Sequence, residues 1–241
     1  MTLTDDRAAG LTSSPVEALR YENVINHPLE SSGKTIQMVP RGARVLDVGC
    51  GIGGLGQLLR DVRGAEVIGI EPHPARAEAA RLRGLTVHTG LLDAPLLANL
   101  GQFDVILFAD VLEHLVAPEE MLRLAATGLR PDGTVIASTP NVAHWTVRLS
   151  LLAGNFDYAP IGIMDATHLR WFTVKTIDQL FESAGFQIVE YAGAAGTWMK
   201  QYGQWPIAWI PTKRRHQMVH WLAQKIPGLF ACQHVVRAVR R

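Results

Sequence analysis

The stretch VLDVGCGIGG at residues 45–54 decides the fold, because an apolar strand pattern runs directly into a glycine-rich turn. Gly49, Gly51 and Gly54 have the G-x-G-x-x-G spacing, and a helical pattern follows over residues 54–63. A strand, a glycine turn and a helix in this order present backbone N–H groups to a ligand at the start of the helix. Glu71 ends the next apolar run, 22 positions after Gly49. Taken alone, this spacing is that of the dinucleotide-binding fingerprint.

Outward from this stretch, apolar strand patterns alternate with helical patterns, which is typical of a parallel sheet covered by helices on both faces. We expect a doubly wound, mostly parallel α/β sheet of seven strands, because crossovers between parallel strands are right-handed. The predicted strands lie at residues 44–48, 66–70, 85–88, 104–108, 134–138, 187–191 and 234–240, and the main helices at 54–63, 74–83, 118–129 and 174–184.

The whole chain, 1–241, is expected to form a single domain. Three of its segments are expected to lie outside the sheet. Residues 1–40 are expected to form a helical cap, with helices at 15–21 and 29–38. Residues 140–173 form a long irregular stretch, and such stretches inside a compact domain are usually functional loops or lids. An insert at residues 197–231 precedes the last strand and carries four tryptophans, Trp198, Trp205, Trp209 and Trp221.

The composition excludes several classes of protein. With 48% hydrophobic and 19% charged residues, the 241-residue chain is long and apolar enough to bury a core. Two cysteines are too few for a disulfide scaffold or a cysteine-rich zinc site. No apolar run reaches the roughly 18 residues of a membrane span. Residues 1–14 lack the apolar stretch of a signal peptide, so a cytoplasmic location is expected.

The net charge of +1 hides a split between two parts of the chain. Residues 197–241 hold eight basic residues and no acidic one, whereas residues 1–196 hold 15 basic and 22 acidic residues. Three of these cations, Lys213, Arg214 and Arg215, lie in the first turn of a predicted helix, 212–226, where they oppose the helix dipole. An anionic group, a lipid headgroup or a partner subunit is therefore a candidate contact, and a solvated face is the alternative. Met218, Trp221, Leu222 and Ile226 are expected to share one face of this helix.

Asp47 separates two interpretations of the glycine turn. A carboxylate two residues before the first glycine repels a pyrophosphate, but it suits a cationic ammonium or sulfonium group. Asp-x-Gly-x-Gly-x-Gly after a strand resembles the S-adenosylmethionine loop of class I methyltransferases. The resemblance implies that Glu71 binds the ribose hydroxyls and that Asp93 approaches the adenine amino group. The cofactor-binding residues expected on this basis, together with Asp110 at the carboxyl end of the fourth strand, are Asp47, Gly49, Gly51, Gly53, Glu71, Asp93 and Asp110.

Downstream motifs extend this resemblance over residues 40–193. FDVILFADVLEHL at 103–115, LRPDGTVI at 129–136 and GIMDATHLRWFT at 162–173 look like the branch that includes ubiquinone and sugar O-methyltransferases. The resemblance implies a Rossmann-like enzyme that converts S-adenosylmethionine to S-adenosylhomocysteine. Glu113 and His114 within the first motif are interpreted as a solvated helix end or a capped turn.

The acceptor atom is expected to be oxygen. The place where nucleic-acid N-methyltransferases carry Asn/Asp-Pro-Pro-aromatic holds ADVL at residues 109–112, so nucleic acid is not an expected partner. Cys50 and Cys232 lie outside the loop that a cysteine nucleophile would need. A hydroxyl acceptor must lose its proton, which calls for a general base or a metal.

Three residues of the lid are the candidate catalytic groups: His144, Asp165 and His168. Asp165 and His168 are three apart and would lie on one face of a helical turn. Neutral histidine suits general base catalysis near neutral pH. The same three residues are the candidate ligands of a divalent metal such as Mg²⁺, although histidines suit a transition metal better. The alternative is that they hold the lid through hydrogen bonds.

The expected acceptor is a small molecule or an oligosaccharide, and a saccharide such as a mannoside is favoured because lid histidines and acids beside aromatic walls suit a polyol. A quinone or phenol is the alternative acceptor, and for it a more continuous apolar pocket is expected. A fatty-acid carboxyl group is a further alternative acceptor. A cofactor-binding module without turnover and a dehydrogenase are the competing classes. Tyr21, Asn26 and His27 are expected to close the site, and the insert tryptophans to serve the core or a homodimer contact.

Overall fold

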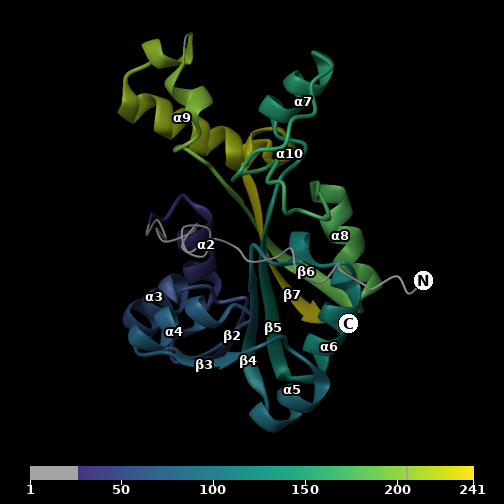
Figure 1. Ribbon diagram of the computed structural model, residues 1–241. Coiled ribbons are helices and arrows are strands. Elements are labelled where there is room, and N and C mark those ends of the chain that lie inside the picture. Colours follow the sequence, from purple (N-terminus) through teal and green to yellow (C-terminus); the bar gives the residue numbers. More distant parts are fainter. Residues whose placement is uncertain (1–26, 205) are drawn as a thin grey trace, which may run out of the picture.

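The computed structural model describes residues 27–204 and 206–241, and its centre is a seven-stranded sheet (Figure 1). The strand order is β3-β2-β1-β4-β5-β7-β6, and only β7 runs antiparallel to its neighbours. The predicted mostly parallel sheet is therefore confirmed. The strands are β1 (Arg44–Val48), β2 (Glu66–Glu71), β3 (Thr86–Thr89), β4 (Phe103–Ala109), β5 (Leu129–Pro140), β6 (Phe186–Ala194) and β7 (Gln233–Arg240).

Helices cover both faces of the sheet because each central strand is apolar on both sides. In β4, Val105 and Leu107 pack into one buried cluster, whereas Ile106 and Phe108 pack into the other. The first cluster includes side chains of α2 (Ser31–Met38), α3 (Gly54–Arg63) and α4 (Pro74–Leu82). The second includes side chains of α5 (Ala94–Leu100), α6 (Pro118–Thr127) and α8 (Val174–Ser183).

Local sequence signals set the ends of these helices. A proline occupies the first turn of α4, α5 and α6, where its missing N–H costs no hydrogen bond. Thr173 and Thr176 form a capping box at the start of α8. Gly64 ends α3 in a left-handed conformation, with φ of 66°. Helix α5 was not expected, because it has only seven residues and one short turn gives a weak periodic pattern.

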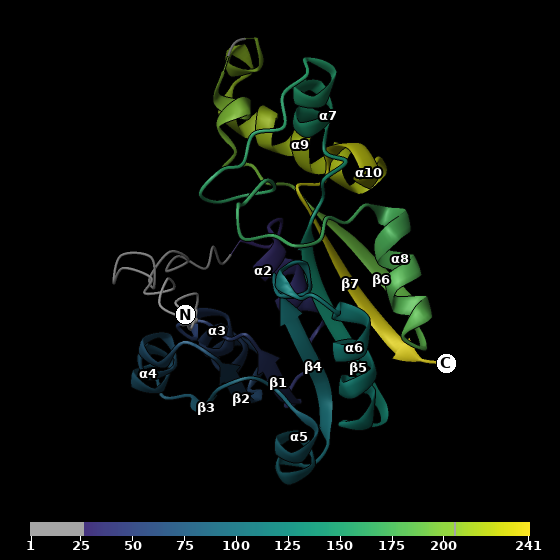
Figure 2. The same ribbon diagram turned by 45° about the vertical axis from the view of Figure 1, so that its right-hand side comes forward.

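A separate lobe lies beyond the carboxyl ends of the parallel strands. Figures 1 and 2 show α7 (Trp145–Leu152), α9 (Thr212–Lys225) and α10 (Pro227–Phe230) together at this end of the molecule. The predicted lid contributes α7 and the predicted insert contributes α9 and α10. Both segments therefore contain helices, and both sit over the edge of the sheet where open α/β proteins bind ligands.

The face of α9 that packs differs from the expected one. Met218, Trp221 and Ile226 are exposed, whereas Val219 and Ala223 are buried. The physical reason is a close backbone approach to β6, since a Cβ atom on Gly193 would collide with the carbonyl of Ala223. Small side chains let the two elements come this close, and the large ones are left on the outer face.

No helix in the described ranges is long and apolar enough to cross a membrane. The cytoplasmic location and the division into one domain stay predictions. The helix expected at 15–21, as well as Tyr21, Asn26 and Trp205, lies outside the described residues.

Candidate functional site

A cavity of about 790 Å³ lies at the carboxyl ends of β1, β2, β4 and β5. Its walls come from the loops after these strands, from α2, and from parts of the lid and the insert. The position agrees with the general rule for ligand binding in open α/β sheets. The volume is within the range of small-molecule sites and leaves room for a cofactor together with a small acceptor.

The glycine loop after β1 depends on left-handed backbone. Gly49 has φ of 75° and Gly51 has φ of 56°, values that favour glycine. A Cβ atom on Gly49 would lie 2.7 Å from Cγ2 of Val111, so this glycine lets the loop pack under the segment after β4. A Cβ atom on Gly51 would meet nothing within 4 Å. Gly51 lines the cavity, and its backbone is therefore open to a ligand.

Two buried acids support this loop. Glu71 accepts hydrogen bonds from the backbone N–H groups of Gly51 and His73, each at 2.9 Å, and so braces the turn. Asp47 is 2% exposed and also lines the cavity. Burial, and then the charge of Glu71, raise the pKa of Asp47 to about 7. A cationic group bound nearby would favour the ionised form of Asp47.

Asp110 follows β4 and is the one non-glycine residue with positive φ, 55°, in the described part of the chain. Such a backbone is held only where its surroundings enforce it. Oδ1 of Asp110 accepts hydrogen bonds from Ser138 Oγ at 2.9 Å and from Gln233 Nε2 at 2.7 Å. Strands β5 and β7 thus fix a carboxylate at the cavity wall, and burial raises its pKa.

Asp93 has a different place from the expected one. Its Oδ1 accepts the backbone N–H of Leu96 at 2.8 Å, which makes it the N-cap of α5. Among the described residues, Gly90, Leu91 and Leu92 line the cavity, and Asp93 does not. The expectation that Asp93 contacts adenine is therefore corrected, because the capping bond turns the carboxylate toward its own helix.

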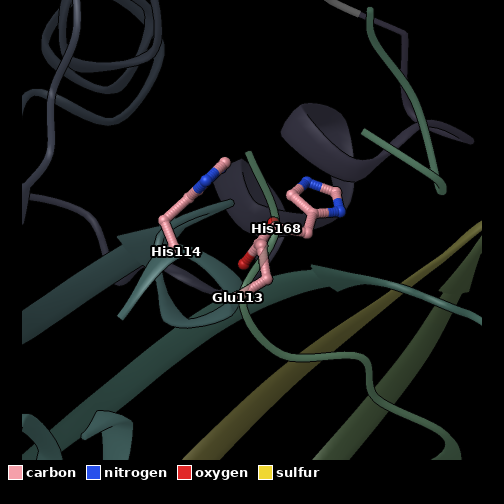
Figure 3. A group of neighbouring side chains, drawn as sticks. All are labelled: Glu113, His114 and His168. Atoms are coloured by element: carbon pink, nitrogen blue, oxygen red, sulfur yellow. The ribbon is translucent and has the colours of Figure 1, made fainter. Parts of the chain in front are cut away.

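Glu113 and His114, in the segment after β4, form a cluster with His168 of the lid, and all three line the cavity (Figure 3). One ligand atom from each residue lies within 4.8 Å of the other two. Glu113 is 1% exposed, and neither carboxylate oxygen has a hydrogen-bond partner in the described ranges. Burial, and then the charge of Asp110, raise the pKa of Glu113 well above its usual range. The interpretation of Glu113 as solvated is therefore wrong.

Backbone hydrogen bonds bring these three residues together. The carbonyl of Glu113, in the 3₁₀ helix Leu112–His114, accepts the N–H groups of Leu169 at 2.8 Å and of Arg170 at 3.0 Å. This pairing draws the end of the lid against the segment after β4. Nδ1 of His168 donates to the carbonyl of Ile163 at 3.2 Å, which leaves Nε2 to accept a proton or bind a metal.

His144 lies apart from this cluster, whereas Asp165 is next to it, because the N–H of His168 donates to the carbonyl of Asp165 at 3.1 Å. His144 is fully buried at the start of α7, where Nδ1 contacts Thr146 and Nε2 lies 3.2 Å from the Tyr202 hydroxyl. Burial lowers its pKa to about 4. Asp165 accepts the N–H and hydroxyl of Thr167 at 2.8 and 2.7 Å, in a turn rather than a helix.

Of the expected catalytic and metal-binding trio, only His168 is among the described residues that line the cavity. The expected grouping is therefore corrected at His144, which packs against Thr146 and Tyr202, whereas Asp165 and His168 share one turn. The geometry places His168 with Glu113 and His114. A carboxylate without a hydrogen-bond partner and two imidazoles are a donor set that suits a divalent cation, and the imidazoles favour a transition metal over Mg²⁺.

Residues 29–191 match a family model described as a methyltransferase domain. The chain belongs to this methyltransferase family. The ubiquinone biosynthesis O-methyltransferase of Azorhizobium caulinodans is 31% identical over 176 residues, 70% of this chain and 67% of that protein. The protein of the same description from Ruegeria pomeroyi is 33% identical over 63% of each chain. The matches thus span about two thirds of these relatives.

Solved structures show the same fold. The CcbJ methyltransferase from Streptomyces caelestis has a TM-score of 0.61 at 15% identity, covering 93% of this chain and 96% of that one. The magnesium protoporphyrin IX methyltransferase of Synechocystis, solved with bound S-adenosylhomocysteine, has a TM-score of 0.54 at 20% identity, covering 83% and 75%. By its family and its relatives this chain is an S-adenosylmethionine-dependent methyltransferase and not a dehydrogenase.

Proposed function

We propose that this methyltransferase transfers the methyl group of S-adenosylmethionine to a phenolic hydroxyl of an aromatic acceptor. The observation that carries the proposal is the buried cluster of Glu113, His114 and His168 in the same cavity as the glycine loop. The names of the relatives, ubiquinone biosynthesis O-methyltransferases, support an oxygen acceptor.

The cofactor occupies the end of the cavity beside β1 and β2 in this proposal. Asp47 faces the ammonium group or the sulfonium, the open backbone of Gly51 contacts the methionine part, and Glu71 accepts from the ribose hydroxyls. Gly53 keeps the turn before α3 in its left-handed form, with φ of 79°. Asp110 stands between this end and the cluster, close to the reacting methyl group.

The reaction forms a bond between the acceptor oxygen and the methyl carbon and breaks the bond between that carbon and sulfur. The electron pair of the broken bond stays on sulfur, giving S-adenosylhomocysteine, and the hydroxyl proton goes to a base. His168 is the candidate base, because burial lowers its pKa and keeps it neutral near pH 7. Where a divalent cation is held by Glu113, His114 and His168 instead, Nε2 of His168 would be a ligand and not the base, and the cation would lower the pKa of the acceptor hydroxyl so that its proton is lost to water.

The lining near the cluster favours an aromatic acceptor over a saccharide. Leu115, Met121, Ile161, Ile163 and Trp198 supply apolar surface there. A polyol such as a mannoside needs a polar partner for most of its hydroxyl groups, since an unpaired buried hydroxyl is costly. A flat ring needs one or two polar partners at its edge and apolar walls elsewhere.

An acceptor screen with labelled S-adenosylmethionine tests the proposal, using catechol, methyl α-mannoside and decanoate. We expect methylation of catechol, loss of this activity in EDTA, and its return with Mn²⁺. Methylation of the mannoside or decanoate without methylation of catechol would contradict the phenolic acceptor. Full activity in EDTA would contradict the cation and leave His168 as the base.

A further inference from the structure

Trp198 is a large apolar side chain that is half exposed although it lies on the wall of a cavity. It follows β6 and lines the cavity together with Ile161 of the lid. The exposed fractions are 50% for Trp198 and 52% for Ile161. Apolar surface left in water at a cavity wall gains free energy when a ligand covers it. Because the residues beside β1 and β2 account for the cofactor, the acceptor is the molecule left to cover Trp198.

The backbone that presents Trp198 is fixed by a tight turn. The N–H of Met199 donates to the carbonyl of Gly196 at 3.0 Å, so Thr197 and Trp198 are the two central residues of the turn. Gly196 has φ of 64°, and a Cβ atom there would collide with Cys232. Glycine therefore allows the turn to pack against Cys232, the residue before β7, so Trp198 belongs to a close-packed turn and not to a free loop.

Glu30, at the start of α2, holds this turn directly. Its buried carboxylate accepts the N–H of Gly196 and the N–H of Thr197, each at 3.0 Å, and the Thr197 hydroxyl at 2.7 Å. The N–H of Ala195 donates to the carbonyl of Leu29 at 3.1 Å. Glu30 directly precedes α2, yet its side chain makes no capping hydrogen bond to that helix. The carboxylate instead ties the start of α2 to the turn that carries Trp198.

We propose that Trp198 determines acceptor specificity by stacking on the planar ring of the acceptor, and that Glu30 is a positioning residue that holds Trp198 in place. The inference rests on the proposed function, since it takes the acceptor to be aromatic. Trp198 shares the cavity with Glu113, His114 and His168. A ring that lies on Trp198 can therefore present a hydroxyl at its edge to that cluster, and acceptors without a planar ring lose the stacking contact.

Calorimetric titration of catechol into the enzyme saturated with S-adenosylhomocysteine and Mn²⁺ tests the stacking, and it requires no turnover. We expect Trp198→Ala to raise the Kd for catechol about tenfold and Trp198→Phe to raise it about twofold, because the smaller ring keeps part of the contact. Trp209→Ala is the matched control in the same insert. Trp209 is 82% exposed and is not among the described residues that line the cavity, so its removal should leave the Kd unchanged.

The outcomes separate this inference from the proposed function. Equal catechol affinity in the native protein and Trp198→Ala overturns the inference, and so does a native protein that does not bind catechol. Methyl transfer is measured on the same samples. Binding that depends on Trp198 without methylation of catechol contradicts the proposed function alone. The affinity for S-adenosylhomocysteine should stay within about twofold in all three tryptophan variants, which confirms that they fold.

A double-mutant cycle tests the role of Glu30. Glu30→Gln places an amide against donors that need a carboxylate, so we expect a rise in the Kd for catechol similar to that of Trp198→Ala. The double variant should be no weaker than Trp198→Ala alone, because Glu30 acts through Trp198. Thr197→Val, which removes one of the three hydrogen bonds, should give a smaller rise. Additive effects of Glu30→Gln and Trp198→Ala would assign Glu30 a general structural role. They would overturn the proposal that Glu30 positions Trp198.

Discussion

The two ends of the cavity are built in different ways. The cofactor end draws most of its residues from one short stretch, 45–54, and from the end of the adjacent strand β2. The acceptor end combines Glu30, Glu113, His168 and Trp198, which come from four separate segments. A cofactor shared by many enzymes is bound by local geometry, whereas the acceptor is recognised by contacts that exist only after folding. Variants at each end should therefore fail in different ways.

The largest expected effect is at the acceptor end. Glu113→Gln removes the carboxyl group at the centre of the cluster, which among the described residues is the one acidic ligand available to a cation there, and we expect kcat to fall by about 100-fold or more. The affinity for S-adenosylhomocysteine, measured by calorimetry, should stay within about twofold because the cofactor end is untouched. Glu120→Gln, on the exposed side of α6, is the control. A cofactor affinity that falls together with kcat would show that the two ends are not independent.

The next effect is at the cofactor end. Asp47→Asn should weaken S-adenosylhomocysteine binding about tenfold at pH 8, since a charge beside a cationic group is lost. The pKa of Asp47 is about 7 in the empty cavity, so the native affinity should rise from pH 6 to pH 8 as Asp47 ionises. Calorimetry at both pH values checks this, and the variant should show no such rise.

The raised pKa of Asp47 has the opposite effect on the stability of the empty protein. The folded protein holds a proton on Asp47 up to about pH 7, whereas the ordinary pKa is 3.8. The folded state thus binds more protons between these values, and stability falls as the pH rises through this window. Asp47→Asn should therefore raise the Tm of the empty protein at pH 8. A lowered Tm would indicate that Asp47 stabilises the loop in its ionised form.

A variant of His144 tests whether this residue of the lobe contributes to stability or to catalysis. Because its imidazole is buried between Thr146 and Tyr202, His144→Ala should cost about 2 kcal/mol of stability and change kcat less than twofold. Its pKa is lowered to about 4, so its stabilising contribution is present above about pH 6.5 and is lost as the pH falls toward 4. Denaturant unfolding at pH 7 and pH 5 checks both points. A large loss of kcat in a folded His144→Ala would restore the histidine as a catalytic residue.

The smallest expected difference is within α9. Trp221 is 57% exposed, so Trp221→Ala should change the free energy of unfolding by less than about 0.5 kcal/mol. Val219 is 2% exposed, and Val219→Ala should cost about 1–2 kcal/mol because it leaves a cavity against β6. Urea unfolding of both variants measures the difference. A large loss of unfolding free energy in Trp221→Ala would show that the outer face of α9 is covered in solution.

The sequence predicted the sheet and the glycine turn well, because each relies on signals within a few residues. Alternating apolar runs give the strands, and Asp47 with three glycines gives the loop. Asp93 was misplaced because an acid before a helix serves equally well as an N-cap. His144 and His168 have similar local surroundings in sequence, and only the pairing of Leu169 and Arg170 with the Glu113 carbonyl separates their roles. Such long-range hydrogen bonds leave no periodic pattern.

The insert leaves the sheet after Ala194 and returns at Gln233, and these two residues are paired partners on β6 and β7. The segment that carries Trp198 and α9 is therefore the connection of an antiparallel hairpin. Lengthening, shortening or replacing it changes no strand register and no residue of the glycine loop. Evolution can alter the wall around the acceptor in this way while the methyl donor site is inherited unchanged, and a designer can exchange the same segment to redirect the enzyme.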